Sequence, residues 1–369
     1  MNRLFGWKQT GVFLLALAAG ILPFAVPEVC TAALREGLAL CCGPLLLSLF
    51  PFLVVSRLLI QCPESDLLAL PFRLAAWGIG IRTPCAARVL CIGFLGGFAP
   101  AASAAAQAVR TGQLTVEEAD ALLPACICSG PSFVVLTVGQ SLLGSAELGV
   151  LLFASQVTAN YLTAALLNRF AGVRSVKLGS AAPASPAPPR LDEILADAAI
   201  TYCKLCGFIL FFRMLAAGAG ALLPAGAGTL CSILLEVCSG CDLASRTGRW
   251  GSLLCCAALS VQGLSVLLQV RTICPPEMTL RPLYRARLLH LPLSLALFYL
   301  LLPGGEADVF STLPARVLLM RRVPPDCALL VFAVCCMAAC TLRSGIRQVE
   351  QKQMARNAGG CCINSKTLL

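Results

Sequence analysis

The chain has 369 residues, of which 58% (about 214) are hydrophobic and only 12% are charged. Soluble domains contain about 45–50% apolar and about 25% charged residues, so the composition excludes a soluble enzyme, a nucleic-acid-binding domain and a disordered scaffold. Because a spanning helix needs about 20 apolar residues, the chain can supply at most about ten spans. The composition predicts an all-α, polytopic helical membrane protein.

Positive charge gathers at both ends of the chain and in its middle. The net charge is +10, from 28 Lys and Arg against 18 Asp and Glu. Arg3 and Lys8 precede the first apolar run, more basic residues lie in 169–190, and a basic segment follows the last apolar run. By the positive-inside rule all three places face the cytoplasm, so each half crosses the membrane an even number of times. We assign this charge to topology rather than to binding of nucleic acid.

Apolar runs divide the chain into two halves. Residues 1–170 form an N-terminal transmembrane half, 171–190 a Pro/Ala-rich cytoplasmic linker, 191–342 a C-terminal transmembrane half, and 343–369 a basic cytoplasmic tail. The linker has four prolines and no hydrophobic periodicity, which is typical of a solvated spacer. Roughly eight to ten spans are predicted, over the apolar runs 11–26, 38–60, 88–109, 121–138, 148–167, 200–223, 230–241, 253–270, 288–302 and 328–342.

The run 121–138 cannot be one regular helix. Thr115 and Glu118 form a capping box that starts a helix before it, and the segment CSGPS at 128–132 then interrupts it. The proline lacks an amide hydrogen and biases the preceding glycine away from the helical region. Because unpaired backbone groups are unfavourable in hydrocarbon, we expect this break to line a cavity. It supplies four candidate substrate contacts, Ser129, Gly130, Pro131 and Ser132.

A second interruption lies in the C-terminal half, where EVCSGC at 236–241 breaks the run that begins at residue 230. Cys-Ser-Gly occurs at 128–130 and, 110 residues later, at 238–240. Interrupted segments at corresponding places in two halves indicate a transporter site near the bilayer midplane, where half-helix N-termini present N–H groups to an anion. Close packing of small residues is the alternative explanation. The second break adds Ser239 and Gly240 to the candidate contacts.

Few ionisable side chains lie within the apolar runs. Glu236 abuts the second break, which makes it the candidate ion-coupling residue; pairing with Lys204 or Arg213 is the alternative. Arg57 and Arg213 lie near the ends of runs and are expected to snorkel to the interface. His290 follows two arginines at the start of a run, which favours an interfacial histidine over a proton relay.

Two glutamines lie in the otherwise apolar run 253–270. Gln262 and Gln269 flank a glycine and Ser265. Interhelical hydrogen bonds explain such residues without a ligand, whereas a re-entrant hairpin would bring them to a substrate. Both explanations are kept, and the three polar residues join the candidate contacts.

The 22 cysteines do not indicate a catalytic or metal site. Cys203 with Cys206, and Cys238 with Cys241, have the spacing of zinc ligands or of a redox pair. They lie on apolar segments of a chain with a single histidine, where cysteine acts as a small hydrophobe. The sequence also has no phosphate loop, GxSxG or HExxH motif. We therefore expect no enzymatic activity, no catalytic residue, no metal and no cofactor.

Several segments between about residues 45 and 295 carry motifs in a fixed order. They are LFPFLVVSRLLI (49–60), GGFAPAA (96–102), LTVEEA (114–119), CICSGPSF (126–133), LEVCSG (235–240), QGLSVLLQV (262–270) and YRARLLH (284–290). In this order they resemble the motifs LFPFxxxSxLL, SGYPxGA, LTxxEA, CNxSxPxF, LExxxG, GLSVxxQ and YxxRLLH of the sporulation integral membrane protein YlbJ family.

The resemblance implies a nucleoside-recognition or gate-type membrane domain, similar to concentrative nucleoside carriers, with inverted repeats and re-entrant hairpins. It adds Phe98, Pro100 and Ser103 to the candidate contacts. It also implies a role in endospore formation, for which one proposed activity is movement of dipicolinate, a small dicarboxylate, towards the forespore. The chain has Ile127 and Cys128 where the family tends to have asparagine, so backbone amides and serine hydroxyls are expected to do more of the recognition.

Together these features predict a secondary transporter of a small anionic or nucleoside-like solute, with its site between the interrupted segments. The alternative is a membrane scaffold or gate subunit that transports nothing and acts through a partner protein. The expected partners are the lipid bilayer and a dicarboxylate or nucleoside-like solute, and a homo-oligomer is left open. The expected location is the cell or forespore membrane, with both termini in the cytoplasm.

Overall fold

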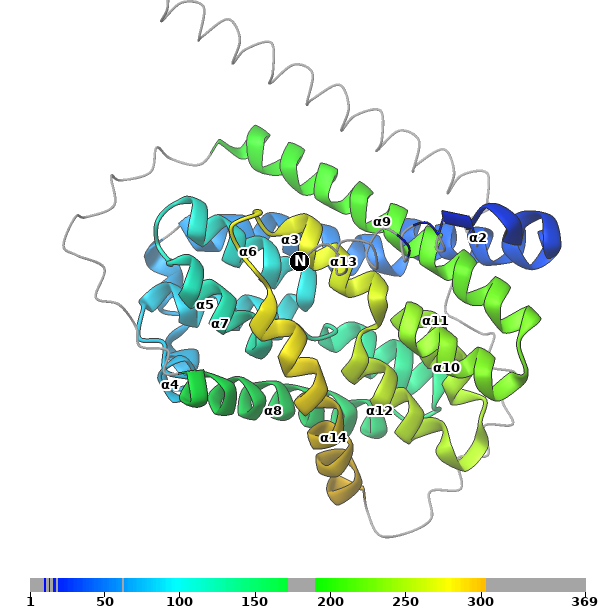
Figure 1. The fold of residues 1–369 in the computed structure, drawn as a ribbon. Helices are drawn as coiled ribbons and strands as arrows, with labels where there is room; N and C mark the ends of the chain where they lie inside the picture. The colour runs from blue at the N-terminus through cyan, green and yellow to red at the C-terminus, as the bar shows by residue number, and fades with distance from the viewer. Residues whose placement is uncertain are drawn as a thin grey trace, which may run out of the picture.

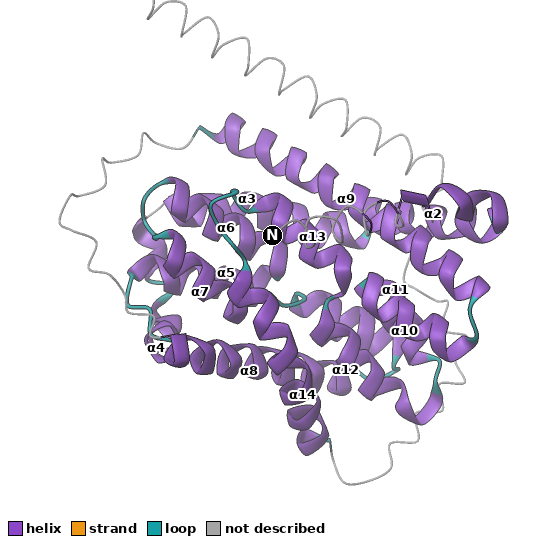
Figure 2. Ribbon diagram, viewed as in Figure 1, coloured by secondary structure: helices purple, strands orange, loops and turns teal. Residues whose placement is uncertain are grey.

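The computed structural model describes residues 19–61, 63–171 and 190–302, together with positions 10, 13, 16 and 17 of the N-terminal run. Within these ranges the regular structure is helical and no strand occurs, as Figures 1 and 2 show. The predicted all-α class is therefore confirmed. The apolar run 328–342, the tail 343–369 and most of the linker 171–190 lie outside the described residues.

Each half is a series of helices of very different lengths. The N-terminal half contains α2 (Pro27–Cys42), α3 (Pro44–Gln61), η1 (Pro63–Asp66), α4 (Leu70–Gly78), α5 (Pro84–Gly96), α6 (Phe98–Arg110), α7 (Val116–Cys126), the π-helix η2 (Ser132–Leu142) and α8 (Ala146–Ala171). The C-terminal half contains α9 (Leu191–Leu222), α10 (Ala225–Leu235), α11 (Val237–Ser245), η3 (Gly248–Trp250), α12 (Gly251–Val261), α13 (Gly263–Ile273) and α14 (Arg281–Leu301).

Helices α5 and α6 form a re-entrant hairpin whose tip is a single residue. Gly97 joins them with a φ of 80°, which glycine adopts without steric penalty. A Cβ on Gly93 of α5 would lie 3.2 Å from that of Ala101 of α6. Near the open end, Arg88 of α5 donates a 2.7 Å hydrogen bond to Gln113, just beyond α6. The apolar run that predicted one span here is therefore two half-length helices that begin and end on the same side.

The next two helices form the predicted broken span. Glu118 donates its amide to the Thr115 hydroxyl over 3.1 Å, and its carboxylate accepts from the Thr115 amide over 3.2 Å, so the capping box that starts α7 is confirmed. Residues 127–130 leave the helical conformation, Pro131 is helical again, and η2 continues from Ser132.

Helix α8 runs back beside the whole broken span. Asn168 donates to the carbonyl of Ala121 in α7 over 3.2 Å. Asn160 donates to the carbonyl of Ile127, in the break, over 3.2 Å. Further along, glycines of α8 and η2 bring the two backbones into contact. Side-chain amides of α8 thus hydrogen-bond to carbonyls of the broken span.

The C-terminal half repeats this order of elements. Helices α10 and α11 form a second hairpin with its tip at Glu236, and a Cβ on Gly240 would lie 2.8 Å from the Cα of Ile233. Helices α12 and α13 form a second broken span, interrupted at Gln262, where φ is 65°. Helix α14 packs against α12 as α8 packs against α7. The run 230–241, predicted as one span, is therefore a hairpin.

This order corrects the predicted pairing of the two interruptions. By position in the repeat, the tip Gly97 corresponds to the tip Glu236, and the break at 127–130 corresponds to Gln262. The Cys-Ser-Gly match between the two halves pairs a broken span with a hairpin, so it does not mark the repeat. A tripeptide of common residue types recurs readily in a chain of this composition.

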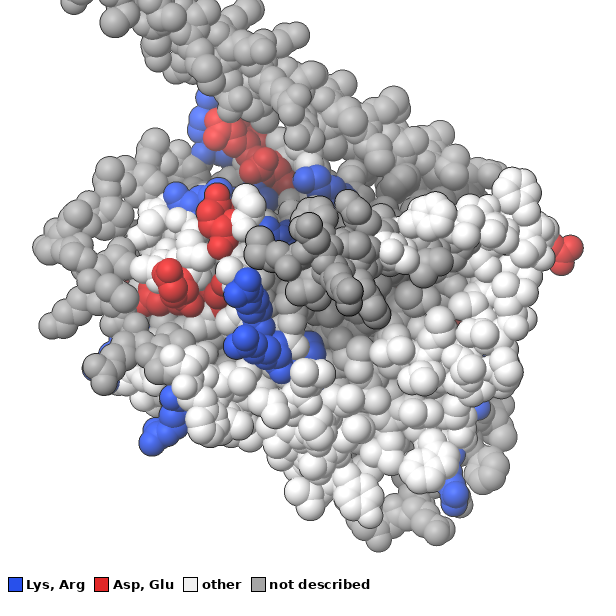
Figure 3. Space-filling model, in the orientation of Figure 1, with Lys and Arg blue, Asp and Glu red and all other residues white. Residues whose placement is uncertain are grey.

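Three helices of the described part are long and apolar enough to cross a membrane: Ala146–Ala171, Leu191–Leu222 and Gly248–Ile273. Shorter apolar helices lie at Leu49–Ile60, Pro84–Gly96, Ser132–Leu142 and Ala225–Leu235. Figure 3 shows charged side chains near the first turns of α9 and further down the left half of this face, and a broad, mostly uncharged surface on its right. These helices are compatible with a multi-pass membrane protein, while the total of eight to ten spans stays a prediction.

Candidate functional site

Each hairpin tip lies against the break of its own half. A Cβ on Gly97 would lie 2.7 Å from the amide nitrogen of Gly130. In the second half, a Cβ on Gly263, which follows the break, would lie 2.9 Å from the carbonyl oxygen of Leu235, beside the tip Glu236. Both glycines have positive φ, so glycine is needed here both for conformation and for close approach. The four interruptions of the helices therefore form two backbone contacts.

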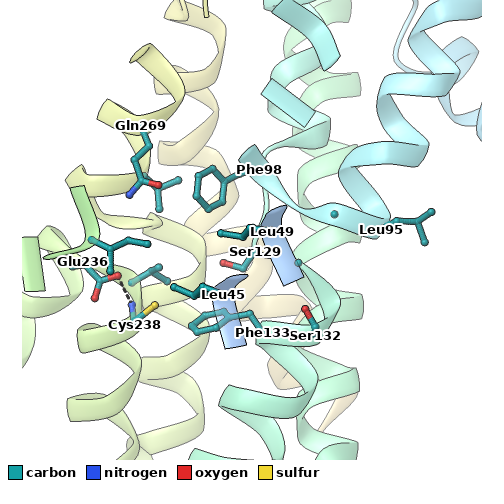
Figure 4. A pocket seen from close by; sticks show the side chains of 15 residues that line it. Leu45, Leu49, Leu95, Phe98, Ser129, Ser132, Phe133, Glu236, Cys238 and Gln269 are labelled. Carbon is teal, nitrogen blue, oxygen red and sulfur yellow. Dashed lines mark hydrogen bonds between the residues drawn. The ribbon is translucent and has the colours of Figure 1, made fainter. Parts of the chain in front are cut away.

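A pocket lies between these contacts. It is lined by α3, both hairpins, the first break, α9 and α13, through Leu45, Leu49, Leu95, Gly96, Phe98, Ser129, Gly130, Ser132, Phe133, Ile209, Glu236, Val237, Cys238, Val266 and Gln269. Figure 4 shows Glu236, Cys238 and Gln269 on one side, and Phe98, Ser129 and Ser132 on the other. The wall is mostly apolar, with a few polar groups, as in many sites for small molecules.

Three helices begin at this pocket, and their N-termini differ in how they are capped. The first residues of α6, η2 and α11 all line it. No side chain caps α6 or η2, whereas Glu236 caps α11. The first N–H groups of a helix lack partners within the helix and carry its positive dipole end. The pocket therefore presents two uncapped positive ends, which favour an anionic or hydrogen-bond-accepting group.

Glu236 has its carboxylate engaged by the helix that follows it. The carboxylate accepts hydrogen bonds from the amides of Cys238 and Ser239 over 2.9 and 2.7 Å, and from the Ser239 hydroxyl over 2.9 Å. The amide of Gly240 donates to the Glu236 carbonyl over 2.8 Å. The expectation of free amides near Gly240 is therefore wrong, because the preceding carboxylate already fills that helix N-terminus.

The structure also shows whether Glu236 pairs with Lys204 or Arg213, the two alternative partners expected for it. Arg213 pairs instead with Glu36 over 2.8 Å. Of the described residues, none forms an ion pair with Glu236 within 4 Å, and its side chain is buried. The second hairpin thus brings a fixed carboxylate, held only by N–H and O–H donors, to the wall of the pocket.

Gln262 and Gln269 lie at or near the pocket with unpaired oxygens. Gln262 donates to the Ser129 hydroxyl over 3.4 Å, and Gln269 donates to the Ser265 hydroxyl over 2.9 Å. The side-chain oxygens of both glutamines are buried and have no hydrogen-bond partner. The hydrogen bond from Gln262 to Ser129 joins the two breaks, and that from Gln269 to Ser265 lies within α13. The segment is a broken span rather than a re-entrant hairpin.

Some predicted contacts lie away from the pocket. Ser103 accepts a 3.3 Å hydrogen bond from Arg57, and Arg57 is itself buried and paired with the exposed Asp197 over 2.6 Å; its snorkelling stays a prediction. The pocket wall contains Phe98, Ser129, Gly130, Ser132, Glu236 and Gln269 of the predicted set. It does not contain Pro100, Ser103, Pro131, Ser239, Gly240, Gln262 or Ser265.

His290 corrects a further expectation. It is only 1% exposed, and its ring contacts the backbone carbonyl of Gln156 over 3.2 Å. The interfacial position predicted for it is wrong, because α14 packs between α8 and α12 and turns this face inward. The neighbouring Arg287 is also buried. The basic residues that precede His290 in the sequence indicated a span boundary. Only the packing of α14 shows that this face of the helix points into the protein.

Much of the wall was not predicted. Leu45 and Leu49 of α3, Leu95, Phe133 and Ile209 supply most of its apolar surface. In a chain that is 58% hydrophobic, nothing in the sequence distinguishes these residues from those that face lipid. Their position depends on which face of each helix meets the hairpins.

Comparisons with known protein families, curated proteins and solved structures find no match for this chain. The resemblance to the YlbJ family therefore rests on the sequence motifs alone.

Proposed function

We propose that the chain is a secondary transporter that binds a small solute in the pocket between its two hairpin tips. The observation that carries this proposal is the convergence of three half-helix N-termini on one pocket, two of them without a side-chain cap. Interrupted helices in a membrane protein are tolerated where they line a cavity, and transporters use them to bind substrate near the midplane.

The chemistry of the wall defines the solute. Uncapped amides at the starts of α6 and η2 suit a carboxylate or carbonyl group. The unpaired oxygen of Gln269 suits an N–H or O–H donor, and Phe98 and Phe133 offer ring faces to an apolar or aromatic body. A nucleoside has carbonyl groups, N–H and O–H donors and an aromatic ring, whereas a small dicarboxylate such as dipicolinate has the carboxylates and the ring but, as the dianion, no donor for Gln269. The family resemblance supports the same two classes and a role in endospore formation.

Binding requires a change of conformation. The cavity volume of the pocket is about 60 Å³, far below the roughly 300–1,000 Å³ of sites that hold drug-sized ligands. The two contacts between a hairpin tip and a break should need the least free energy to separate, because glycine backbones meet there without interlocking side chains. Movement of a hairpin away from its break would enlarge the pocket and open it towards one side of the membrane.

Glu236 is the group that we propose to couple transport to a cation. Its carboxylate lines the pocket and has no cationic side chain within 4 Å among the described residues. Its three hydrogen bonds from Cys238 and Ser239 leave about one acceptor position free, since an ionised carboxylate offers about four. A cation bound there would also hold the second hairpin closed.

Uptake into liposomes tests the proposal. Purified protein reconstituted into liposomes should accumulate labelled dipicolinate or labelled uridine, under an imposed gradient of Na⁺ or H⁺, more than protein-free liposomes do. Ser129→Leu and Glu236→Gln should lose uptake while still inserting into the membrane. The matched control is Ser141→Leu, at the far end of η2, whose hydroxyl only donates to a carbonyl of its own helix. Failure of wild-type protein to take up either solute would favour the scaffold.

A further inference from the structure

Arg287 is a buried cation without an acidic partner among the described residues. Its side chain lies on α14 and is 8% exposed. One terminal nitrogen, Nη2, donates to the carbonyl of Ile127 over 2.6 Å. The other, Nη1, donates to the carbonyl of Ser260 over 3.4 Å. A guanidinium at this depth is unfavourable unless its charge is compensated, so these two carbonyls must supply the compensation.

The two carbonyls belong to the C-terminal ends of the two broken spans. Ile127 directly follows α7, and Ser260 lies in the last turn of α12. Carbonyls at a helix C-terminus lack partners within the helix and carry its negative dipole end. A single guanidinium therefore neutralises both helix ends and joins the two halves of the repeat at their breaks.

The two breaks differ in one further donor. Asn160 of α8 donates to the Ile127 carbonyl over 3.2 Å. Asn160 does not donate to the Ser260 carbonyl. The Ile127 carbonyl thus accepts from both Asn160 and Arg287, whereas of these two side chains only Arg287 donates to the Ser260 carbonyl. Because of this difference, substitution of Asn160 and substitution of Arg287 should affect the two breaks differently.

We propose that Arg287 is a positioning residue that fixes both breaks in the conformation that forms the pocket. By holding the Ile127 carbonyl, it allows the chain to leave α7 and start η2 with its amides towards the pocket. By holding the Ser260 carbonyl, it keeps Gln262 against Ser129. The consequence for solute uptake rests on the proposed transport function, whereas the consequence for the breaks does not.

Amide hydrogen exchange of the full chain in detergent, followed by mass spectrometry of peptides, tests the proposal. Arg287→Met should speed exchange on the order of tenfold in peptides covering 126–135 and 258–266, because charged hydrogen bonds to both carbonyls are lost. Asn160→Ala should speed exchange in 126–135 only. The matched control is Arg271→Met, since Arg271 also donates to backbone carbonyls, at Pro275 and Met278, away from both breaks.

A conservative variant separates positioning from general packing. Arg287→Lys keeps the positive charge and three N–H donors, so exchange in both peptides should return to within about threefold of wild type. Exchange in Arg287→Met that rises in neither break, in one break only, or equally throughout the chain would overturn the proposal. So would a lysine variant that exchanges as fast as the methionine variant.

Uptake measured on the same variants distinguishes this proposal from the proposed function. Arg287→Met should raise the KM for solute about tenfold, and Arg287→Lys should restore it. If exchange responds as stated but wild-type protein takes up no solute, the positioning role stands and the transport function fails. If uptake is normal in wild type and unchanged in Arg287→Met, the positioning role fails and the transport function stands.

Discussion

Gln269 is the pocket residue whose hydrogen bonding is least complete. Its side chain is 2% exposed, its nitrogen donates to Ser265, and its oxygen has no partner. A buried acceptor without a partner costs about 1–3 kcal/mol. The protein tolerates this cost at the wall of a pocket, where a solute that carries an N–H or O–H group would remove it.

We expect Gln269→Leu to separate stability from binding. Leucine removes the unpaired acceptor at similar volume, so the thermal unfolding midpoint in detergent should stay equal or rise. The affinity for solute should fall about tenfold, the value of one lost hydrogen bond of about 1.4 kcal/mol. The matched control is Gln107→Leu, because Gln107 accepts from Arg110 near the outer end of α6. A less stable protein with unchanged affinity would contradict the role assigned to Gln269.

At the scale of elements, the tip of the first hairpin depends on glycine for two separate reasons. Gly97 and Gly112 both have positive φ, 80° and 69°. A Cβ on Gly97 would meet the backbone of Gly130, whereas a Cβ on Gly112 would meet nothing within 4 Å. Substitution of Gly97 and of Gly112 therefore distinguishes the effect of backbone strain from the effect of contact between the tip and the break.

Gly112→Ala should cost only the left-handed backbone penalty, about 1–2 kcal/mol. Gly97→Ala should cost about 1–3 kcal/mol more, because the added methyl overpacks the contact with Gly130. Thermal or denaturant unfolding of both variants in detergent gives the comparison. Equal destabilisation of the two variants would show that the tip does not lie against the break.

The cap of α11 gives a second prediction at this scale. Glu236→Ala should destabilise the protein by about 0.5–2 kcal/mol, the usual cost of losing an N-cap. Glu236→Gln keeps an acceptor oxygen, so it should lose less stability than Glu236→Ala while still losing cation-driven uptake. Thr115→Ala removes the cap of α7, away from the pocket, and should lower stability without changing uptake. Cation-dependent uptake by Glu236→Gln would exclude this carboxylate as the coupling group.

At the scale of the whole molecule, the sequence predicts the class of fold and the positions of the interruptions. It predicts less well whether the chain continues or folds back at each interruption. The capping box at Thr115, the break after Cys126 and the interruption at Glu236 are all present. The periodicity of an apolar run does not reveal whether a helix continues or folds back. The hairpin at Gly97 was therefore predicted as a single span, since one glycine among alanines carries no strong signal.

Part of the site could not be predicted from the sequence, because packing between helices that are distant in sequence decides which side chains are buried. Arg287 and His290 lie near the start of α14, where basic residues usually mark a membrane interface. Their burial depends on α14 packing against α8 and α12, which are separated from it in sequence. The first break, by contrast, is predictable because Pro131 must interrupt the helix, and Ser129 and Ser132 near it lie on the pocket wall; that they bind solute stays a prediction.

The claim on which this account rests is that both hairpin tips and both breaks enclose one solute site. An experimental density map of the purified protein, collected with saturating dipicolinate and again with uridine, tests it most directly. We predict hairpins that end at Gly97 and Glu236, and solute density from one of the two compounds between Ser132 and Gln269. Continuous helices through residues 130 and 262, or solute bound only outside this pocket, would contradict the account.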